Sequence, residues 1–375
     1  MRIAVVVERR PGEFRVAAVP DTVALLVRAG HQVVVAAGAG TGAWIGDGEY
    51  ETAGAQVVQG DVLAGAEVVL HVRPLLPDDA GRLARGTVTI GFMTPAAEPD
   101  GVRALRDAGA TSFSMELVPR ISRAQSMDAL TSQALVAGYR CTLEAAMRLP
   151  RFFPLFMTAA GTVPPAKVLV LGAGVAGLQA IATAKRLGAV VQAYDVRPAS
   201  ADEVRSMGAT FVDLGLEAVE GAGGYARELG EERARRQAEL LAPYVAKADV
   251  LITTAAIPGR AAPRLVSAEM VAAMRPGSVA VDLAADSGGN VEGSVAGQEV
   301  VNSGVRIVGM IDTASTMPVD ASRLYAKNLT NLFALMVDAE GGLALNLDDE
   351  VLAGACVTHD GVVRHEPTRQ LLEEN

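Results

Sequence analysis

A glycine-rich turn between an apolar strand and an amphipathic helix is the feature that most constrains how this chain folds. Residues 168–177 read VLVLGAGVAG, in which Gly172, Gly174 and Gly177 have the spacing G-x-G-x-x-G. The first glycine of this motif permits a tight turn, the second lets the backbone approach a pyrophosphate, and the third lets the helix pack closely on the strand. A pyrophosphate then lies at the helix N-terminus, among backbone N–H groups that have no partner within the helix. The sequence therefore predicts a Rossmann-type dinucleotide site at this turn.

The next predicted strand ends in an acidic residue, Asp195. In the Rossmann pattern an acidic residue about 20 residues beyond the glycine motif accepts hydrogen bonds from the ribose hydroxyls. A carboxylate there also repels a 2′-phosphate. We therefore expect the site to take NAD(H) rather than NADP(H).

The composition narrows the class of protein. The chain has 375 residues, of which 50% are hydrophobic and 20% charged, and this indicates two or three globular domains. A net charge of −10 argues against binding nucleic acid, which requires a basic surface. The two cysteines and four histidines show no metal-ligand spacing, so we expect neither a disulfide framework nor a metal. No apolar run reaches the roughly 18 residues of a membrane span, and we expect a cytoplasmic protein without a signal peptide.

Alternating strands and helices predict an α/β fold made of two Rossmann-like, doubly wound domains with a cleft between them. We expect a discontinuous first domain, residues 1–131 plus 312–375, and an NAD-binding second domain, residues 132–311. A long helix over residues 132–149 is suited to connecting the two domains. A helix over residues 325–336 is expected to return the chain to the first domain.

Two short connecting segments complete the predicted order. Residues 81–86 (GRLARG) are expected to form a helix between two strands of the first domain. Residues 158–165 (TAAGTVPP) are expected to form a loop that ends at two prolines.

Residues 213–243 admit two interpretations. A glycine-rich piece is followed by EERARRQAELLAP, which is charged on most faces, and this is typical of a solvated loop and a surface helix. Alternatively, the glycines supply hinge freedom for a mobile loop over about residues 215–232, and Tyr225 closes over a bound ligand.

Several long motifs of this chain resemble one protein family. They are RISRAQSMD (120–128), TAAGTVPPAKVLVLGAGVAGLQAIATAKRLGA (158–189), GGYARELGEE (223–232), ITTAAIPG (252–259) and PGSVAVDLAADSGGN (276–290). They are similar to the NAD(H)-binding component (alpha-1 subunit, domain I) of proton-translocating NAD(P) transhydrogenase, which is related to alanine dehydrogenase. The resemblance covers almost the whole chain.

The resemblance implies an enzyme that is active only with partner subunits. This chain would hold NADH and pass a hydride directly to NADP⁺ on a separate NADP-binding subunit, while a membrane subunit translocates protons. The family's component is a homodimer, and it lies peripheral to the inner membrane through its partners. Hydride transfer between two nicotinamide rings needs positioning rather than a nucleophile, a metal or a protein acid.

The resemblance also implies two sets of site residues. Those around the transferred hydride would be Arg120, Gln125, Asp128, Thr131 and Tyr225. Those that bind the cofactor would be Arg120, Ile121, Ser122, Gln125, Gly172, Ala173, Gly174, Val175, Gly177, Asp195, Val196, Arg197, Gly224, Gln237 and Ala256. Arg120 and Asp128 are candidates for holding the nicotinamide and its carboxamide, although the residues alone also fit a surface ion pair.

The chain departs from the family pattern at a few positions. Thr131 stands where the family usually has Ser, and Val7 and His71 stand where relatives commonly have Lys. Residues 311–316 (IDTAST) replace a stretch that typically carries Pro and Arg, which leaves partner docking or closure open.

Two other functions remain as alternatives. Alanine dehydrogenase shares the fold and the RVA motif at Arg15, but it would require a substrate-binding lysine near position 71 and a catalytic histidine after the fourth strand. This chain has His71 and GFM (91–93) instead. A non-catalytic, NAD-binding regulatory paralogue is the second alternative, which the change at residues 311–316 permits.

Overall fold

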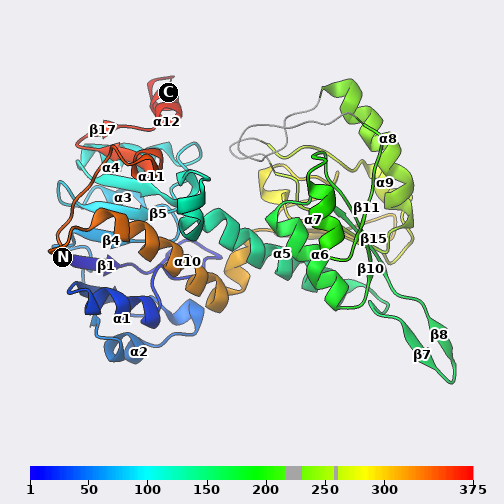
Figure 1. Cartoon of the computed structure of the whole chain (residues 1–375), viewed down its shortest axis with the longest axis horizontal. Helices are drawn as coiled ribbons and strands as arrows, with labels where there is room; N and C mark the ends of the chain where they lie inside the picture. Colours follow the sequence, from blue (N-terminus) through cyan, green and yellow to red (C-terminus); the bar gives the residue numbers. More distant parts are fainter. Residues whose placement is uncertain (217–229, 257–260, 375) are drawn as a thin grey trace. The chain divides into compact units, whose positions relative to one another are not determined.

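The chain divides into two compact units in a computed structural model that describes residues 1–216, 230–256 and 261–374 (Figure 1). The first unit is discontinuous and comprises Met1–Gln133 and Ala314–Asn375, and the second comprises Ala134–Thr313. Helix α5 (Ala129–Arg148) begins in the first unit and continues in the second.

The first unit is built on an eight-stranded sheet. Its strands are β1 (Arg2–Val5), β2 (Gln32–Ala36), β3 (Gln56–Val58), β4 (Val68–Leu70), β5 (Val88–Gly91), β6 (Thr111–Ser114), β16 (Cys356–His359) and β17 (Val362–Val363). The order is β17-β16-β6-β5-β4-β1-β2-β3, in which β1 to β6 pair in parallel and β16 and β17 are antiparallel. The central strands are short apolar runs that are buried along their whole length, as expected for parallel strands covered on both faces.

Helices and short 3₁₀ turns connect these strands. They are α1 (Pro20–Arg28), η1 (Thr41–Ala43), α2 (Asp47–Thr52), α3 (Pro77–Ala80), α4 (Pro99–Asp107), η2 (Met115–Leu117), η3 (Ser122–Met127), η6 (Thr313–Thr316, at the unit boundary), α10 (Pro318–Phe333), η7 (Ala334–Met336), α11 (Glu350–Ala355) and α12 (Glu366–Glu374). The helix expected over residues 81–86 is wrong. The helix there is α3, which starts at a proline, and the residues after it form turns because Gly86 has φ +83°.

The second unit is built on a seven-stranded sheet. Its strands are β9 (Lys167–Leu171), β10 (Val190–Tyr194), β11 (Thr210–Phe211), β12 (Val250–Thr253), β13 (Val279–Asp282), β14 (Glu299–Asn302) and β15 (Val305–Gly309). The order is β11-β10-β9-β12-β13-β15-β14, and all pairs are parallel except β14 with β15. The predicted α/β class with two Rossmann-like sheets is confirmed.

Helices cover both faces of this second sheet. They are α6 (Val175–Arg186), α7 (Ser200–Ser206), α8 (Glu231–Lys247) and α9 (Ala268–Ala272), with η5 (Ala285–Ser287) after β13. Successive residues of β9 enter different cores: Val168 packs with the side chains of α5 and α6, and Leu169 with those of α8 and α9. The helix α8 is thus anchored through Leu241 and Val245, although its charged sequence had suggested a fully solvated surface helix.

The loop expected over residues 158–165 is also wrong. Strands β7 (Phe156–Thr158) and β8 (Gly161–Val163) form an antiparallel hairpin that protrudes from the second unit (Figure 1). The prolines at 164 and 165 end this hairpin rather than abolish it, because they follow its last paired residue.

Candidate functional site

The glycine turn lies between β9 and α6, at the carboxyl ends of β9 and β12 where the strand order reverses. Gly172 has φ +99°, and a Cβ at Gly177 would overlap the carbonyl oxygen of Gly172. Thr254 follows β12, and its hydroxyl donates to that same carbonyl oxygen at 3.0 Å. Gly174 precedes the first residue of α6, and no described atom lies within 4 Å of where its Cβ would be. The turn therefore leaves room for a ligand at Gly174 and for nothing beside Gly172 and Gly177.

Asp195 is hydrogen-bonded by the protein at both carboxylate oxygens. Oδ2 accepts from the Ala173 N–H at 2.7 Å, and Oδ1 accepts from the Arg197 N–H at 2.8 Å. The Arg197 guanidinium adds Nε to Oδ1 at 2.9 Å and Nη2 to Oδ2 at 3.1 Å. These bonds raise the pKa of Arg197 above its ordinary value. A ribose diol must therefore compete with Arg197 for Asp195, and the guanidinium offsets part of the charge that was expected to repel a 2′-phosphate.

A hollow of about 140 Å³ lies beyond the ends of β10 and β11. Val196, Phe211 and Leu214 line it with apolar surface, and Arg205 and Arg233 add positive charge. Among the described residues, the buried Nε of Arg233 has no hydrogen-bond partner. The hollow adjoins Asp195, on the side where the Rossmann pattern places adenosine.

Gln237 lies on α8 one turn after Arg233 and is buried. Its side-chain oxygen accepts from the Tyr194 hydroxyl at 3.1 Å. Burial raises the pKa of Tyr194 to about 12, so this hydroxyl stays a donor at neutral pH. Ala256 is exposed and directly precedes residues 257–260, which lie outside the described residues.

The remaining candidate residues belong to the first unit, in the segment that leads into α5. Asp128 caps this helix, since its carboxylate accepts from the Thr131 N–H at 2.8 Å and from the Thr131 hydroxyl at 2.6 Å. The hydroxyl that replaces the family's serine thus holds Asp128 in place. The side chains of Arg120, Ser122 and Gln125 are exposed, and Ile121 is half-buried.

Helix α10 fixes the same segment from another side. The Nδ2 atoms of Asn328 and Asn331 both donate to the Ser126 carbonyl at 2.9 Å. The backbone that carries Gln125 is therefore anchored while its side chain faces solvent. Gly224 and Tyr225, together with most of the expected mobile loop, lie in residues 217–229, outside the described residues.

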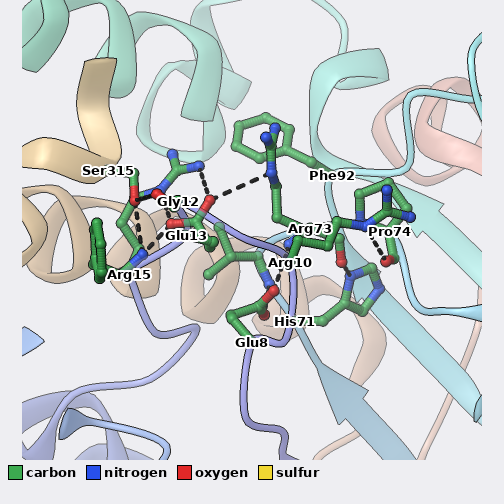
Figure 2. Close-up of polar contacts among 12 residues, drawn as sticks. Glu8, Arg10, Gly12, Glu13, Arg15, His71, Arg73, Pro74, Phe92 and Ser315 are labelled. Atoms are coloured by element: carbon green, nitrogen blue, oxygen red, sulfur yellow. Dashed lines mark hydrogen bonds and ion pairs between the residues drawn. The ribbon is translucent and has the colours of Figure 1, made fainter. Parts of the chain in front are cut away.

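A buried polar cluster occupies the position at which the alanine dehydrogenase alternative would need its substrate site (Figure 2). The Arg15 guanidinium donates to both oxygens of Glu13, at 2.8 and 2.6 Å, and to Gln133 Oε1 at 2.8 Å. Ser315, from the segment that departs from the family pattern, donates to the Gly12 carbonyl and accepts from the backbone N–H of residue 14, both at 2.7 Å. Arg15 is thus saturated by protein acceptors, and the changed segment retains a structural role.

His71 and Glu8 lie beside this cluster (Figure 2). The Nδ1 atom of His71 is 2.7 Å from the Arg73 carbonyl oxygen, and burial lowers the His71 pKa to about 4, so the ring is neutral at pH 7. Glu8 accepts from the backbone N–H groups of Val72 at 2.6 Å and Arg73 at 3.1 Å. Burial nevertheless raises the pKa of Glu8 to about 7. His71 therefore does not supply the fixed positive charge of a lysine.

Sequence reasoning missed one buried polar residue near the glycine turn, Asn290, which hydrogen-bonds the backbone that follows β12. It ends the motif SGGN, which was used only as a family signature. A buried asparagine after two glycines was the available signal. Across the described ranges, no helix is long and apolar enough to cross a membrane.

Comparisons with known proteins agree over nearly the whole chain. The model of the alanine dehydrogenase/PNT N-terminal domain matches residues 4–137, and that of the C-terminal domain matches residues 141–366. The first of the chains that make up NAD(P) transhydrogenase subunit alpha in Rhodospirillum rubrum is 48% identical, over 97% of this chain and 98% of its own length. The alanine dehydrogenase of Mycobacterium tuberculosis is 33% identical over 98% of this chain and 95% of its own length. The crystal structure of transhydrogenase from Sinorhizobium meliloti has a TM-score of 0.88 at 47% identity, covering 97% of this chain and 100% of that chain.

Proposed function

The chain belongs to the alanine dehydrogenase/PNT family, and we propose that within it the chain is the NAD(H)-binding component of a proton-translocating transhydrogenase. It would pass a hydride between its own NAD(H) and NADP(H) held by a partner subunit. The observation that carries this proposal is the glycine turn, which combines open space at Gly174 with close packing at Gly172 and Gly177. The higher identity to transhydrogenase than to alanine dehydrogenase supports the same assignment.

The protein's task in this reaction is positioning. The nicotinamide supplies the hydride acceptor or donor, and no protein group needs to take a proton. The N-terminus of α6 would bind the pyrophosphate through backbone N–H groups, and Asp195 would bind the adenosine ribose once Arg197 yields a hydrogen bond. Asp128 and Thr131 would hold the nicotinamide end, with Arg120 and Gln125 beside them. The rigid Asp128–Thr131 cap suits this role, because a misplacement of about 1 Å costs much of the rate.

The structure offers little to the amino-acid dehydrogenase alternative. That chemistry would need free cationic groups for a substrate carboxylate, whereas Arg15 is saturated by Glu13 and Gln133. His71 is buried and neutral, and its pKa is lowered to about 4. A purely regulatory role is not favoured by any feature of the nucleotide site.

We further propose that the chain acts as a homodimer and meets the membrane only through a partner subunit. The hairpin of β7 and β8 supports the dimer, since Met157 at its end is 75% exposed and Phe156 and Leu155 are also exposed. Phe152 stacks edge-on against Phe156, with ring centroids 4.6 Å apart. An apolar arm of this kind is typical of an interface between copies of a chain.

The direct test mixes the purified chain with an NADP-binding transhydrogenase component and follows hydride exchange between NADH and NADP⁺. We expect exchange only when both proteins are present, and Asp128→Asn should slow it. The control incubates the chain alone with NADH, pyruvate and ammonia. Steady NADH oxidation in that control, with no exchange in the mixture, would establish the dehydrogenase alternative.

A further inference from the structure

The side chain of Asn290 joins two backbone segments beside the glycine turn. Asn290 is 0% exposed, and it follows β13 at the end of a Gly-Gly pair. Its Oδ1 accepts from the Ala255 N–H at 3.1 Å, and its Nδ2 donates to the carbonyl oxygens of Ala255 and Pro263, both at 2.8 Å. The amide thus uses both of its donors and its acceptor on backbone groups.

Ala255 and Pro263 flank residues 256–262 of the chain, which include the cofactor candidate Ala256. One side chain therefore holds both ends of this stretch. The preceding residue, Thr254, is bonded to the glycine turn by its hydroxyl and by its N–H, which donates to the Leu171 carbonyl at 2.9 Å. The backbone next to Ala256 is thereby fixed relative to the place where the dinucleotide turn begins.

Asn290 is itself held on several sides. Its carbonyl oxygen accepts from the N–H groups of Leu265 at 2.9 Å and Val266 at 3.0 Å. The buried Asp282 accepts from the Val291 N–H at 3.0 Å and from the Thr253 hydroxyl at 3.1 Å. The amide of Asn290 is therefore preorganised before any ligand arrives.

We propose that Asn290 is a positioning residue for the cofactor, which fixes Ala255 and Pro263 so that Ala256 meets the bound dinucleotide. The inference rests on the proposed function, because it assumes that this site binds NAD(H). Removing the amide leaves the N–H and carbonyl of Ala255 and the carbonyl of Pro263 without partners in a buried place, so the cost falls on this stretch. Asn290 is expected to act through backbone geometry and not through direct contact with the cofactor.

The substitution Asn290→Asp tests this with little change in shape. An ionised carboxylate has no donor and faces the carbonyl oxygens of Ala255 and Pro263, whereas protonation restores one donor. We expect the Kd for NADH, measured by fluorescence titration, to rise at least about tenfold near pH 8 and to recover in part near pH 5.5. The neighbouring charged groups Asp282, Arg264 and Glu292 are the same in wild type, which therefore reports any pH effect of their own.

The matched control is Asn302→Asp, at the end of β14 in the same unit, where the side chain accepts only a local bond from the Ser303 hydroxyl. It should bind NADH as wild type does at both pH values. In the hydride-exchange assay, Asn290→Asp should raise KM for NADH more than it lowers kcat. A merely structural role would lower the amount of folded protein and leave KM unchanged.

Three outcomes decide the proposal. A folded Asn290→Asp with the wild-type Kd near pH 8 overturns it, and if that variant does not fold, a folded Asn290→Ala with the wild-type Kd overturns it equally. Hydrogen exchange at the Ala255 amide gives a readout that needs no ligand: faster exchange in Asn290→Asp, slowed again in acid, supports the clamp, and unchanged exchange overturns it. If wild type itself binds no NADH, the proposed function fails, and the exchange result still decides whether Asn290 fixes this backbone.

Discussion

Glu8 gives the first unit a pH-dependent stability that can be worked out from its surroundings. Its carboxylate is half-buried, accepts two backbone N–H bonds and has lost any lysine at positions 7 and 71. Burial outweighs the hydrogen bonds and raises its pKa from 4.5 to about 7. An acid whose pKa is raised by folding binds its proton more tightly in the folded state, so stability falls as pH rises from about 4.5 to about 7.

The size of this effect follows from the shift. The pKa changes by about 2.5 units, and at 1.36 kcal/mol per unit this gives a ceiling of about 3 kcal/mol. Solvent reaches the half-buried side chain and reduces the ceiling to roughly 1–2 kcal/mol. The substitution Glu8→Gln mimics the protonated acid and removes the titration. We therefore expect the glutamine variant to match wild type near pH 4.5 and to be more stable by roughly 1–2 kcal/mol near pH 8.

The assay is urea unfolding at several pH values, followed by circular dichroism and by fluorescence. Trp44 is the chain's single tryptophan and lies in the first unit, so its fluorescence reports that unit. The matched control is Glu51→Gln, an exposed carboxylate on α2, which should leave the slope between about pH 5 and pH 8 unchanged. A difference between Glu8→Gln and wild type that stays constant over this range would refute the reasoning, because Glu8 would then be ionised throughout.

The remaining predictions concern the second unit. Gly174→Ala should leave thermal stability unchanged and weaken NADH binding, because its Cβ meets only open space in the free protein; Gly177→Ala should lower stability by about 1–3 kcal/mol as well, and equal melting temperatures for the two variants would contradict this. Arg197→Gln should weaken NADPH binding more than NADH binding, since the guanidinium offsets the charge that repels a 2′-phosphate; calorimetry that gives an unchanged ratio of the two constants would speak against it. Arg233→Leu should weaken NADH binding severalfold and leave reduced nicotinamide mononucleotide unaffected, because Arg233 lines the hollow on the adenosine side; Arg235→Leu on the exposed face of α8 is the control, and equal losses in both variants would count against the assignment.

The parts of this fold that could be predicted from the sequence are those fixed by neighbouring residues. The glycine turn is one example, because Gly172 and Gly177 are five residues apart and their conformations are dictated by the strand and helix that they join. The hairpin of β7 and β8 was missed although it is local, since two prolines just beyond its last pair suggested a loop. The helix over residues 81–86 was misplaced by a few residues, toward two glycines and away from the proline that starts α3.

The partners of the site residues could not be predicted, because they are distant in sequence. Asn290 bonds Ala255, 35 residues earlier, and Ser315 bonds the Gly12 carbonyl, 303 residues earlier. No periodicity or spacing rule relates such positions in a single sequence. The motif SGGN and the segment IDTAST were noticed as patterns, but their hydrogen bonds depend on which loops the parallel sheet brings to one edge.

Asp195 shows why a residue type at the right spacing is not yet a specificity determinant. The expectation of NAD(H) over NADP(H) treated its charge as uncompensated, whereas Arg197, two residues later, donates to both carboxylate oxygens. The same carboxylate also accepts from Ala173 within the glycine turn, so it ties the turn to the end of β10 before any ribose arrives. Discrimination against a 2′-phosphate then depends on whether Arg197 stays with Asp195 or turns toward the ligand. The affinity ratio for the two cofactors therefore measures the state of the Asp195–Arg197 pair rather than the presence of Asp195 alone.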